Sequence, residues 1–258
     1  MSVARLIRRR LPAAWQPPIR FLYERTRGLL ERELSVVASI THPGDHVADI
    51  GANHGLYTHA LAKRGAVVEA FEPQPECVAV LQAYASRRRS ANVRVHSVAL
   101  SATAGTATLH VPRGSDSSPS ASLRPAADTD TTLDVMLERL DAFKLFDLTF
   151  AKIDVEGSEL EVLRGATETL RRCRPLLLVE IEQRHHQEPV AEVFEQIGSF
   201  GYRGAFLDGS GRLRPLSAFD VERDQLDAAR NADSQRPYVN NFFFSAAGSG
   251  ATYRQWPT

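Results

Sequence analysis

Asp49-Ile50-Gly51-Ala52-Asn53-His54-Gly55 is the stretch of sequence that decides the fold. It lies between an apolar run, residues 46–50, that predicts a strand and a run, residues 56–63, that predicts a helix. A strand that ends in an acid, then a turn of small residues and then a helix, forms a pocket for a nucleotide-like ligand. Glycine suits such a turn because it reaches positive φ easily and lets the backbone approach a ligand closely.

A second carboxylate strengthens this interpretation. Residues 67–72 predict the next strand, and Glu72 ends it about 20 residues past the glycine turn, where an acid accepts hydrogen bonds from ribose hydroxyls. The nicotinamide-type fingerprint G-x-G-x-x-G requires a middle glycine that makes room for a pyrophosphate, but Asn53 occupies that position. The loop therefore suits a nucleoside without a pyrophosphate, such as S-adenosylmethionine, whose ammonium group Asp49 could meet. The alternative is an ordinary strand–helix turn with a solvated Glu72.

Composition limits the class of protein. The 258 residues fit one α/β domain with additions, and the formal net charge of zero lacks the basic excess of a nucleic-acid-binding protein. The two cysteines, Cys77 and Cys173, form no disulfide framework or zinc spacing, which favours a reducing, cytoplasmic location. We expect a small-molecule or glycan partner rather than nucleic acid.

The first 40 residues predict a basic, helical N-terminal arm. Residues 1–10 are rich in Arg and contain no acid, which is compatible with an organellar transit peptide or with a helix on a membrane surface. Pro12 and the Pro17-Pro18 pair would cut an amphipathic helix short and so favour a solvated arm. No apolar run reaches the about 20 residues of a membrane span, and peripheral membrane contact through the arm stays open.

The main domain is expected over residues 41–245. Strand and helix patterns alternate in it, which predicts a mostly parallel sheet with helices on both faces. We expect a helix over residues 132–140 with Asp134 as its N-cap, and a capping box between Ser158 and Glu161. Residues 112–128 are expected to form a long loop that is either mobile and functional or disordered, and residues 246–258 a disordered tail. The predicted strands cover residues 46–50, 67–72, 92–100, 105–111, 148–154, 176–181, 202–207 and 239–244.

Acidic residues recur at the ends of these strands. Asp49, Glu72 and Asp154 each end a predicted strand, and Glu180 lies one residue before the end of another. Ligands of parallel sheets bind outside the carboxyl ends of the strands. The acids are therefore expected to meet at one site.

Five motifs resemble the FkbM family of S-adenosylmethionine-dependent methyltransferases, and the similarity covers roughly residues 41–245. The resemblance implies a class I methyltransferase fold, which is Rossmann-like with a seven-stranded sheet whose last strand is antiparallel. It also implies methyl transfer to an oxygen, commonly on a sugar, glycan or natural product. The motifs that carry it are D-I-G-A-N-H-G-L-Y-T at residues 49–58, F-E-P at 71–73, T-L-D at 132–134, K-I-D-V-E-G-S-E at 152–159 with V-L-R-G-A at 162–166, and N-N-F-F-F at 240–244.

On this basis each candidate residue receives a role. Glu72 is expected to hold the ribose, Ala99 to flank the adenine, and Asp154 and Glu156 to face the reacting centre, where one of them acts as the base. Glu180 is a further catalytic candidate, although an acid at a strand end that pairs with a nearby Arg is an equal alternative. The methionine end is assigned to Asp49 and the glycine turn, so the cofactor-binding set comprises Asp49, Gly51, Ala52, Asn53, Gly55, Tyr57, Thr58, Glu72, Pro73, Ala99 and Asp154.

Three alternatives remain beside this hypothesis. Asp154, Glu180 and the His185-His186 pair could together bind a divalent metal, but adjacent His residues on a polar loop are usually solvated, and we assign no metal ligand. Methylation of nucleobase amines is disfavoured, because residues 154–157 lack the Asn/Asp-Pro-Pro-aromatic block of that class. A non-catalytic S-adenosylmethionine-binding or scaffold protein is the rival from a different class.

Overall fold

A computed structural model describes residues 11–87, 92–112, 121–124, 129–230 and 238–246. Its centre is an eight-stranded sheet in which five neighbouring strands, at residues 93–96, 67–71, 46–50, 148–153 and 176–180, are parallel, while β11 (Asn241–Ala246) runs antiparallel to both of its neighbours. This is the mostly parallel α/β architecture that the resemblance implies, with the short hairpin strand β10 added at one edge. The strands lie in the order β10 (Leu213–Pro215), β9 (Tyr202–Leu207), β11 (Asn241–Ala246), β8 (Leu176–Glu180), β7 (Leu148–Ile153), β1 (His46–Ile50), β2 (Val67–Phe71) and β3 (Val93–His96).

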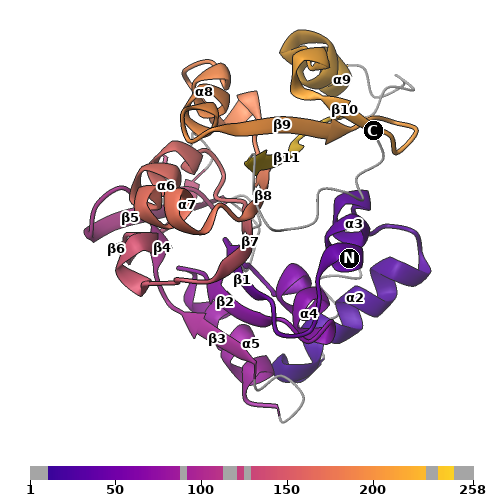
Figure 1. The fold of residues 1–258 in the computed structure, drawn as a ribbon. Coiled ribbons are helices and arrows are strands. Elements are labelled where there is room, and N and C mark those ends of the chain that lie inside the picture. The colour runs from indigo at the N-terminus through magenta and orange to yellow at the C-terminus, as the bar shows by residue number, and fades with distance from the viewer. Residues whose placement is uncertain (1–10, 88–91, 113–120, 125–128, 231–237, 247–258) are drawn as a thin grey trace.

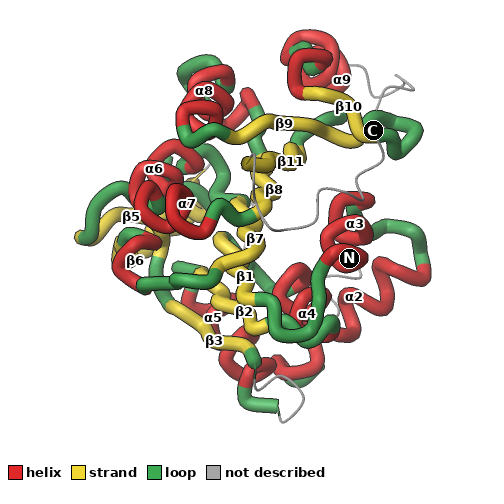
Figure 2. The backbone as a smooth tube through the Cα atoms, in the orientation of Figure 1, coloured by secondary structure: helices red, strands yellow, loops and turns green. Residues whose placement is uncertain are grey.

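Helices cover both faces of this sheet (Figures 1 and 2). On one face, α3 (Arg32–Ile40), α4 (Leu56–Lys63) and α5 (Pro75–Ala85) share a core with Val47, Phe150 and Phe243. On the other face lie α6 (Glu159–Gly165), α7 (Thr167–Cys173) and α8 (Ala191–Ser199). The remaining helical segments are η1 (Ala13–Trp15), α2 (Gln16–Thr26), η3 (Leu140–Phe143), η4 (Gln183–His185), η5 (Leu216–Ala218), the π-helix η6 (Glu222–Leu226) and α9 (Asp227–Arg230).

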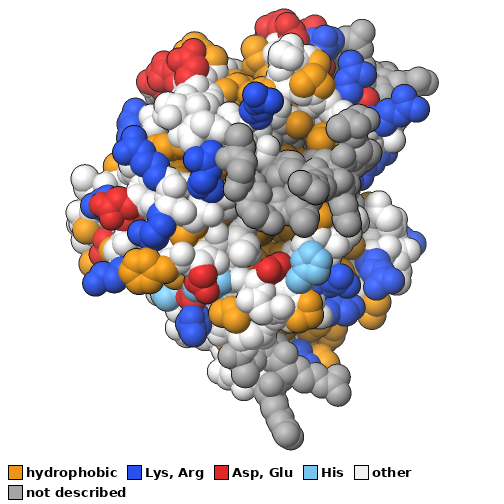
Figure 3. All heavy atoms as spheres, viewed as in Figure 1, with side chains coloured by type: hydrophobic (Ala, Val, Ile, Leu, Met, Phe, Trp, Pro, Cys, Tyr) orange, Lys and Arg blue, Asp and Glu red, His pale blue; other side chains and the backbone are white. Residues whose placement is uncertain are grey.

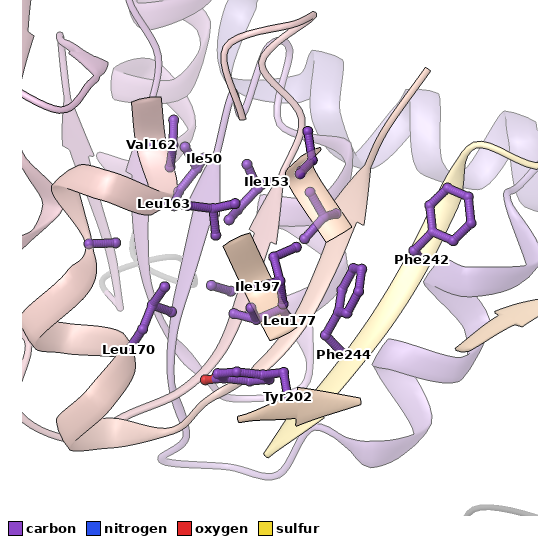
Figure 4. Close-up of a cluster of buried hydrophobic side chains, with 14 of the residues drawn as sticks. Ile50, Ile153, Val162, Leu163, Leu170, Leu177, Ile197, Tyr202, Phe242 and Phe244 are labelled. Atoms are coloured by element: carbon purple, nitrogen blue, oxygen red, sulfur yellow. The ribbon is translucent and has the colours of Figure 1, made fainter. Parts of the chain in front are cut away.

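The near-continuous apolar strands explain why two cores form. Successive side chains of a strand point to opposite faces, so a strand buried on both sides must be apolar throughout. Leu177 and Val179 of β8 join one core and Leu178 the other. Figure 4 shows the first of these cores, where Phe242 and Phe244 of β11 extend the layer that Ile50, Ile153 and Leu177 begin.

A second, three-stranded sheet corrects the sequence-based expectation for residues 132–140. These residues do not form a helix: all but the last two belong to a ten-residue strand, β6 (Thr129–Glu138), which pairs antiparallel with β5 (Gly105–Pro112). Leu133, Val135 and Leu137 alternate with Asp134 and the exposed Met136, and this period of two buries one face against Leu109. Asp134 therefore caps no helix. The expected strand over residues 92–100 is also divided, because β3 ends at His96 and β4 (Ala99–Leu100) pairs with β6 in the smaller sheet.

A buried carboxylate joins three strands of the main sheet. Glu69 Oε1 lies 3.0 Å from His46 Nε2, Glu69 Oε2 lies 2.7 Å from His96 Nε2, and Arg94 also contacts the carboxylate. Burial opposes ionisation, but these hydrogen bonds lower the pKa of Glu69 to about 2. The ring of His96 stacks on Phe71 with centroids 4.6 Å apart. The network thus links β1, β2 and β3 through hydrogen bonds between side chains on one face of the sheet.

Several expected segments lie partly outside the described residues. These are residues 1–10 of the N-terminal arm, with the membrane contact expected there, residues 113–120 and 125–128 of the long loop, and the tail from residue 247. Ser122, inside the loop, is described, and its backbone bridges His110 of β5. In the described part of the chain, none of the helices has the length and apolarity needed to cross a membrane. Figure 3 shows acidic and basic side chains interspersed on one face, in keeping with a formal net charge of zero.

Candidate functional site

The turn after β1 adopts the conformation that its glycines predict, but for a reason the sequence did not show. Gly51 has φ 78° and Gly55 has φ 77°, both in the left-handed region. A Cβ at residue 51 would lie 1.8 Å from the carbonyl oxygen of Asp154, and a Cβ at residue 55 would lie 2.8 Å from Leu81 Cδ2. The glycines therefore allow close packing against the turn after β7 and against α5. This packing brings the ends of β1 and β7 together.

Asp49 connects β1 to the helix that follows the turn. Its carboxylate is buried, and Asp49 Oδ2 accepts a hydrogen bond of 2.5 Å from Thr58 Oγ1 in the first turns of α4. Burial raises the pKa of Asp49, and the hydrogen bond from Thr58 opposes that rise. Thr58 thus orients Asp49, while Asp49 itself lines a cavity at the end of the strand.

Glu72 connects the end of β2 to the same turn. Its side chain is 2 % exposed; Oε2 accepts a hydrogen bond from the Asn53 amide at 2.7 Å, and Oε1 accepts one from the Gln74 amide at 2.8 Å. Burial raises the pKa of Glu72 to about 7, although both amides favour the carboxylate. Asn53 has φ 49°, so it takes the left-handed conformation in which its amide reaches Glu72. Asn53 therefore fixes the carboxylate that was assigned to the ribose.

Lys152 is a buried site residue that the sequence reasoning missed. It lies within β7, its side chain is only 3 % exposed, and its Nζ is 2.7 Å from Asp154 Oδ2 and 4.0 Å from Glu180 Oε2. The ammonium also lies 4.8 Å from the centroid of the Tyr57 ring. Burial alone would lower the pKa of Lys152, but the two carboxylates raise it above its ordinary value. A lysine inside an otherwise apolar strand is the signal that could have revealed it.

Glu180 lies at the end of β8 among other carboxylates. Its Oε1 accepts a hydrogen bond of 2.8 Å from Asn240 Nδ2, and that amide lies 3.2 Å from Glu182 Oε1. Burial and the charge of Asp154 raise the pKa of Glu180 well above its usual range. The sequence alternative expected a nearby Arg, but the basic group that lies beside Glu180 is Lys152.

Glu156 has an unusual backbone and a specific side-chain partner. Its φ of 51° is rare for a residue other than glycine, and such conformations cluster at functional sites. Glu156 Oε2 lies 2.7 Å from His185 Nδ1, and the Glu156 carbonyl accepts a hydrogen bond from Ser122 Oγ at 2.7 Å. Burial raises the pKa of Glu156, and the hydrogen bond from His185 opposes that rise. The segment around Ser122 thus supports the backbone of an acid in the cavity.

The turn that leads into α6 differs from the expected capping box. Ser158 is the N-cap residue, but its side chain makes no capping hydrogen bond. Instead Glu159 Oε1 accepts a hydrogen bond of 2.9 Å from the Gly157 amide, and Glu159 Oε2 lies 2.8 Å from His186 Nε2. The Glu159 carboxylate, one residue after the N-cap, thus accepts a backbone hydrogen bond at this turn. It takes the place of the capping box expected between Ser158 and Glu161.

These elements enclose a cavity of about 370 Å³, within the range of small-molecule sites. Of the predicted cofactor and catalytic residues, only Gly55 and Thr58 are not in its wall, and both support residues that are. The apolar part of the wall includes residues of the smaller sheet and of the loop, and the charged part includes two residues from the N-terminal segment, Arg20 and Glu31. Of these residues, only Ala99 of the smaller sheet was singled out from the sequence. The acidic lining residues are Glu31, Asp49, Glu72, Asp154, Glu156 and Glu180, the basic ones are Arg20 and Lys152, and the apolar ones include Phe71, Val98, Leu100, Leu109, Ala121 and Leu123.

The proposed metal ligands do not form one set. His185 pairs with Glu156, and His186 pairs with Glu159. Within the described ranges, no three His, Cys, Asp or Glu side chains are grouped so that they could hold a metal ion. The combination of Asp154, Glu180 and the two histidines is therefore not assembled here.

Comparisons with known proteins identify similar chains. A family model described as the methyltransferase FkbM domain matches residues 49–203. The solved structure of methyltransferase FkbM from Methylobacillus flagellatus KT has 16% identity and a TM-score of 0.49, and the alignment covers 93% of this chain and 57% of that one. The chain therefore spans little more than half the length of that structure. No curated protein matches the sequence.

Two further solved structures have similar coverage of both chains. The precorrin-6y C5,15-methyltransferase from Geobacter metallireducens GS-15 has 10% identity and a TM-score of 0.45, covering 82% of this chain and 87% of that one. A SAM-dependent methyltransferase from Aquifex aeolicus has 14% identity and a TM-score of 0.43, covering 84% and 89%.

Proposed function

Because the chain belongs to the FkbM methyltransferase family, we propose that it transfers a methyl group from S-adenosylmethionine to a hydroxyl oxygen of a sugar, glycan or natural product. Its sheet, with β11 antiparallel between β8 and β9, is that of a class I methyltransferase. The observation that carries the proposal is the charge of the cavity, whose described wall holds six carboxyl groups and two basic side chains. Such a wall complements a ligand that bears a sulfonium and an ammonium.

The residues of the cavity fit the two halves of this cofactor. Glu72 offers a buried carboxylate for two vicinal ribose hydroxyls, and Phe71, Val98 and Leu100 offer apolar surface for an adenine ring. Asp49, on the other side of the glycine turn, provides a carboxylate for the ammonium. The same wall continues to Asp154 and Glu156, so the methyl group would face these acids.

When bound, S-adenosylmethionine supplies an activated methyl group: the new O–C bond forms as the C–S bond breaks, the electron pair stays on sulfur, and the acceptor hydroxyl loses its proton to a base. We assign Glu156 as that base, because its pKa is raised towards the working pH and its partner His185 lies 2.7 Å away to share the proton. Asp154 is held by Lys152, so we assign it to orienting the acceptor. Glu180 completes the ion-pair group around Lys152.

A non-catalytic cofactor-binding or scaffold role is not favoured. Lys152 and Glu180 are buried with charged partners at a cost in solvation, and Glu156 holds a strained conformation. Neither arrangement is needed merely to bind a nucleoside at the ends of β1 and β2. Both are accounted for if the acceptor hydroxyl is deprotonated beside them.

The proposal is tested with the full chain in two steps. Calorimetry with S-adenosylhomocysteine is expected to show binding, and incubation with methyl-tritiated S-adenosylmethionine and a panel of sugars, glycans and polyketide alcohols is expected to give a labelled ether product. Absence of binding would refute the cofactor. Binding followed by label on an amine or carbon, and never on oxygen, would refute O-methylation.

Glu72→Gln is expected to weaken S-adenosylhomocysteine binding by about 1.5–3 kcal/mol, the range for hydrogen bonds to charged groups, which is about 10- to 150-fold in Kd. In the wild type the affinity should rise between pH 6 and 8, because the pKa of Glu72 is raised to about 7 and only the carboxylate accepts from both ribose hydroxyls. The variant should lose this rise. Calorimetry across that pH range measures both effects.

The matched control is Glu76→Gln, an exposed glutamate in the first turn of α5. It should leave the affinity and its pH dependence unchanged. If Glu72→Gln binds as tightly as the wild type at pH 8, Glu72 does not hold the ribose.

A further inference from the structure

The cavity is poorly suited to one part of the ligand that the proposed function assigns to it. S-adenosylmethionine carries an α-carboxylate, and the described cavity wall already holds six carboxyl groups. An additional carboxylate in such a cavity requires a cation, because like charges within a few ångströms repel strongly when solvent is excluded. Besides His54, the basic side chains of the described wall are Arg20 and Lys152, and only these two are Lys or Arg.

Lys152 is not available for this purpose. Its ammonium is 2.7 Å from Asp154 and 4.0 Å from Glu180, and it faces the Tyr57 ring. Its one positive charge is therefore matched by the two carboxylates next to it. The remaining cation in the described wall is Arg20 of α2, a helix in the N-terminal segment, where no individual site residue was assigned from the sequence.

The guanidinium of Arg20 is only partly used. Arg20 Nε donates to Glu24 Oε1 at 2.7 Å along the helix, and the side chain is 33 % exposed. Nη1 and Nη2 have no hydrogen-bond partner among the residues that the structure describes. Two parallel N–H groups of this kind match the two oxygens of a carboxylate. Glu24 fixes the orientation of the guanidinium plane while these groups stay open.

Contacts of α2 place Arg20 beside the glycine turn. A Cβ on Gly55 would lie 3.5 Å from Pro17 Cγ, one turn before Arg20. Phe21, the next residue, packs edge-on against His59 of α4 with ring centroids 5.2 Å apart. Arg20 is therefore at the end of the cavity formed by the turn after β1 and the start of α4, where Asp49 was assigned to the ammonium.

We infer that Arg20 binds the α-carboxylate of the cofactor's methionine part and that the N-terminal helix α2 is thus a component of the cofactor site. This inference rests on the proposed function. It predicts that the enzyme distinguishes ligands with an amino-acid tail from nucleosides that lack one. The N-terminal segment then contributes to that discrimination together with Asp49 of the central sheet.

The test compares two ligands by calorimetry on the full chain. S-adenosylhomocysteine has the α-carboxylate, whereas 5′-methylthioadenosine has the same nucleoside and thioether without the amino-acid tail. Arg20→Gln should weaken S-adenosylhomocysteine binding by about 10- to 100-fold, as expected for a lost charge-assisted hydrogen bond, and leave 5′-methylthioadenosine binding unchanged within about twofold. Arg20→Lys should recover part of the loss, because lysine restores the charge but not the paired donors.

The control is Arg25→Gln, an exposed arginine of the same helix that is not in the cavity wall; both ligands should bind it as they bind the wild type. Equal weakening of both ligands by Arg20→Gln would mean that Arg20 only supports the fold, and would overturn the inference. Unchanged binding of S-adenosylhomocysteine by Arg20→Gln would also overturn the inference, even if the KM for an anionic acceptor rose. If the wild type binds neither ligand, the proposed function itself fails and the inference fails with it.

Discussion

Replacing Lys152 by methionine should lower the free energy of unfolding by about 3–5 kcal/mol at pH 8, the range seen when one partner of a buried ion pair is removed. Methionine fills a similar volume, so the loss would come from charge. Without the ammonium, Asp154 and Glu180 repel each other in a site where Glu180 is 18 % exposed. Urea unfolding at fixed pH, analysed by linear extrapolation, measures the change.

The pH dependence of this variant follows from the same charges. Burial and the charge of Asp154 already raise the folded-state pKa of Glu180, and removing the cation that opposes this rise would raise it further. The variant is therefore penalised most at a pH where both acids are ionised, and the penalty should shrink as the pH falls towards 5 and one acid binds a proton. The difference in the free energy of unfolding between the wild type and Lys152→Met should therefore become smaller as the pH falls.

Lys144→Met is the matched control, since Lys144 is exposed and has no ion pair among the described residues. It should change stability by less than about 0.5 kcal/mol. Equal stability of Lys152→Met and the wild type at pH 8 would show that Lys152 does not compensate the acids. A loss that does not depend on pH would point to packing instead of charge.

Replacing Glu156 by glutamine should lower kcat for methyl transfer by about 10²- to 10⁴-fold, the usual contribution of a general base. Glutamine preserves the size of the side chain and can still accept a hydrogen bond from His185, but it cannot take up a proton. The Kd for S-adenosylhomocysteine should stay within about threefold of the wild type, because the assigned role concerns the acceptor. The rate is measured with the acceptor that label transfer identifies.

The pH profile separates this role from a structural one. In the wild type the rate should rise with pH through the raised pKa of Glu156, because the carboxylate is the active form. The residual rate of Glu156→Gln should lack that rise. If Asp154→Asn loses more kcat than Glu156→Gln, and Glu156→Gln keeps the pH dependence of the wild type, the base is Asp154 and not Glu156. Glu168→Gln, an exposed glutamate of α7, should match the wild type throughout.

Much of the site could be predicted from the sequence because parallel strands impose it. Asp49 lies in the last residues of an apolar strand, and Glu72 and Asp154 each follow one. The carboxyl ends of parallel strands meet at one edge of the sheet, so the three acids had to converge. Gly51 was predicted to take positive φ, and it does. The close approach of Gly51 to the carbonyl oxygen of Asp154 could not be predicted, because the pairing of β1 with β7 brings these two residues together.

The failures also have physical causes. Residues 132–140 were expected to be helical from a cap-like Asp134, yet pairing with β5 along most of β6 determines their conformation. A local pattern cannot report a partner more than 20 residues away, and the tertiary contact overrides the local preference. Lys152 was overlooked because only its position in the fold shows that Asp154 and Glu180 surround it.

The sequence by itself determined the strand–helix order, the turn at residues 51–55 and the row of acids at the strand ends, because these follow from local periodicity and from glycine's conformational freedom. The tertiary structure alone decided which charges meet. It placed Lys152 between two carboxylates, Glu156 against His185, and Arg20 of α2 at the glycine turn. Each of these contacts joins elements distant in the chain or depends on the direction of a side chain within the packed fold. Burial strengthens the interaction between these charges, and it does so only once the packing exists.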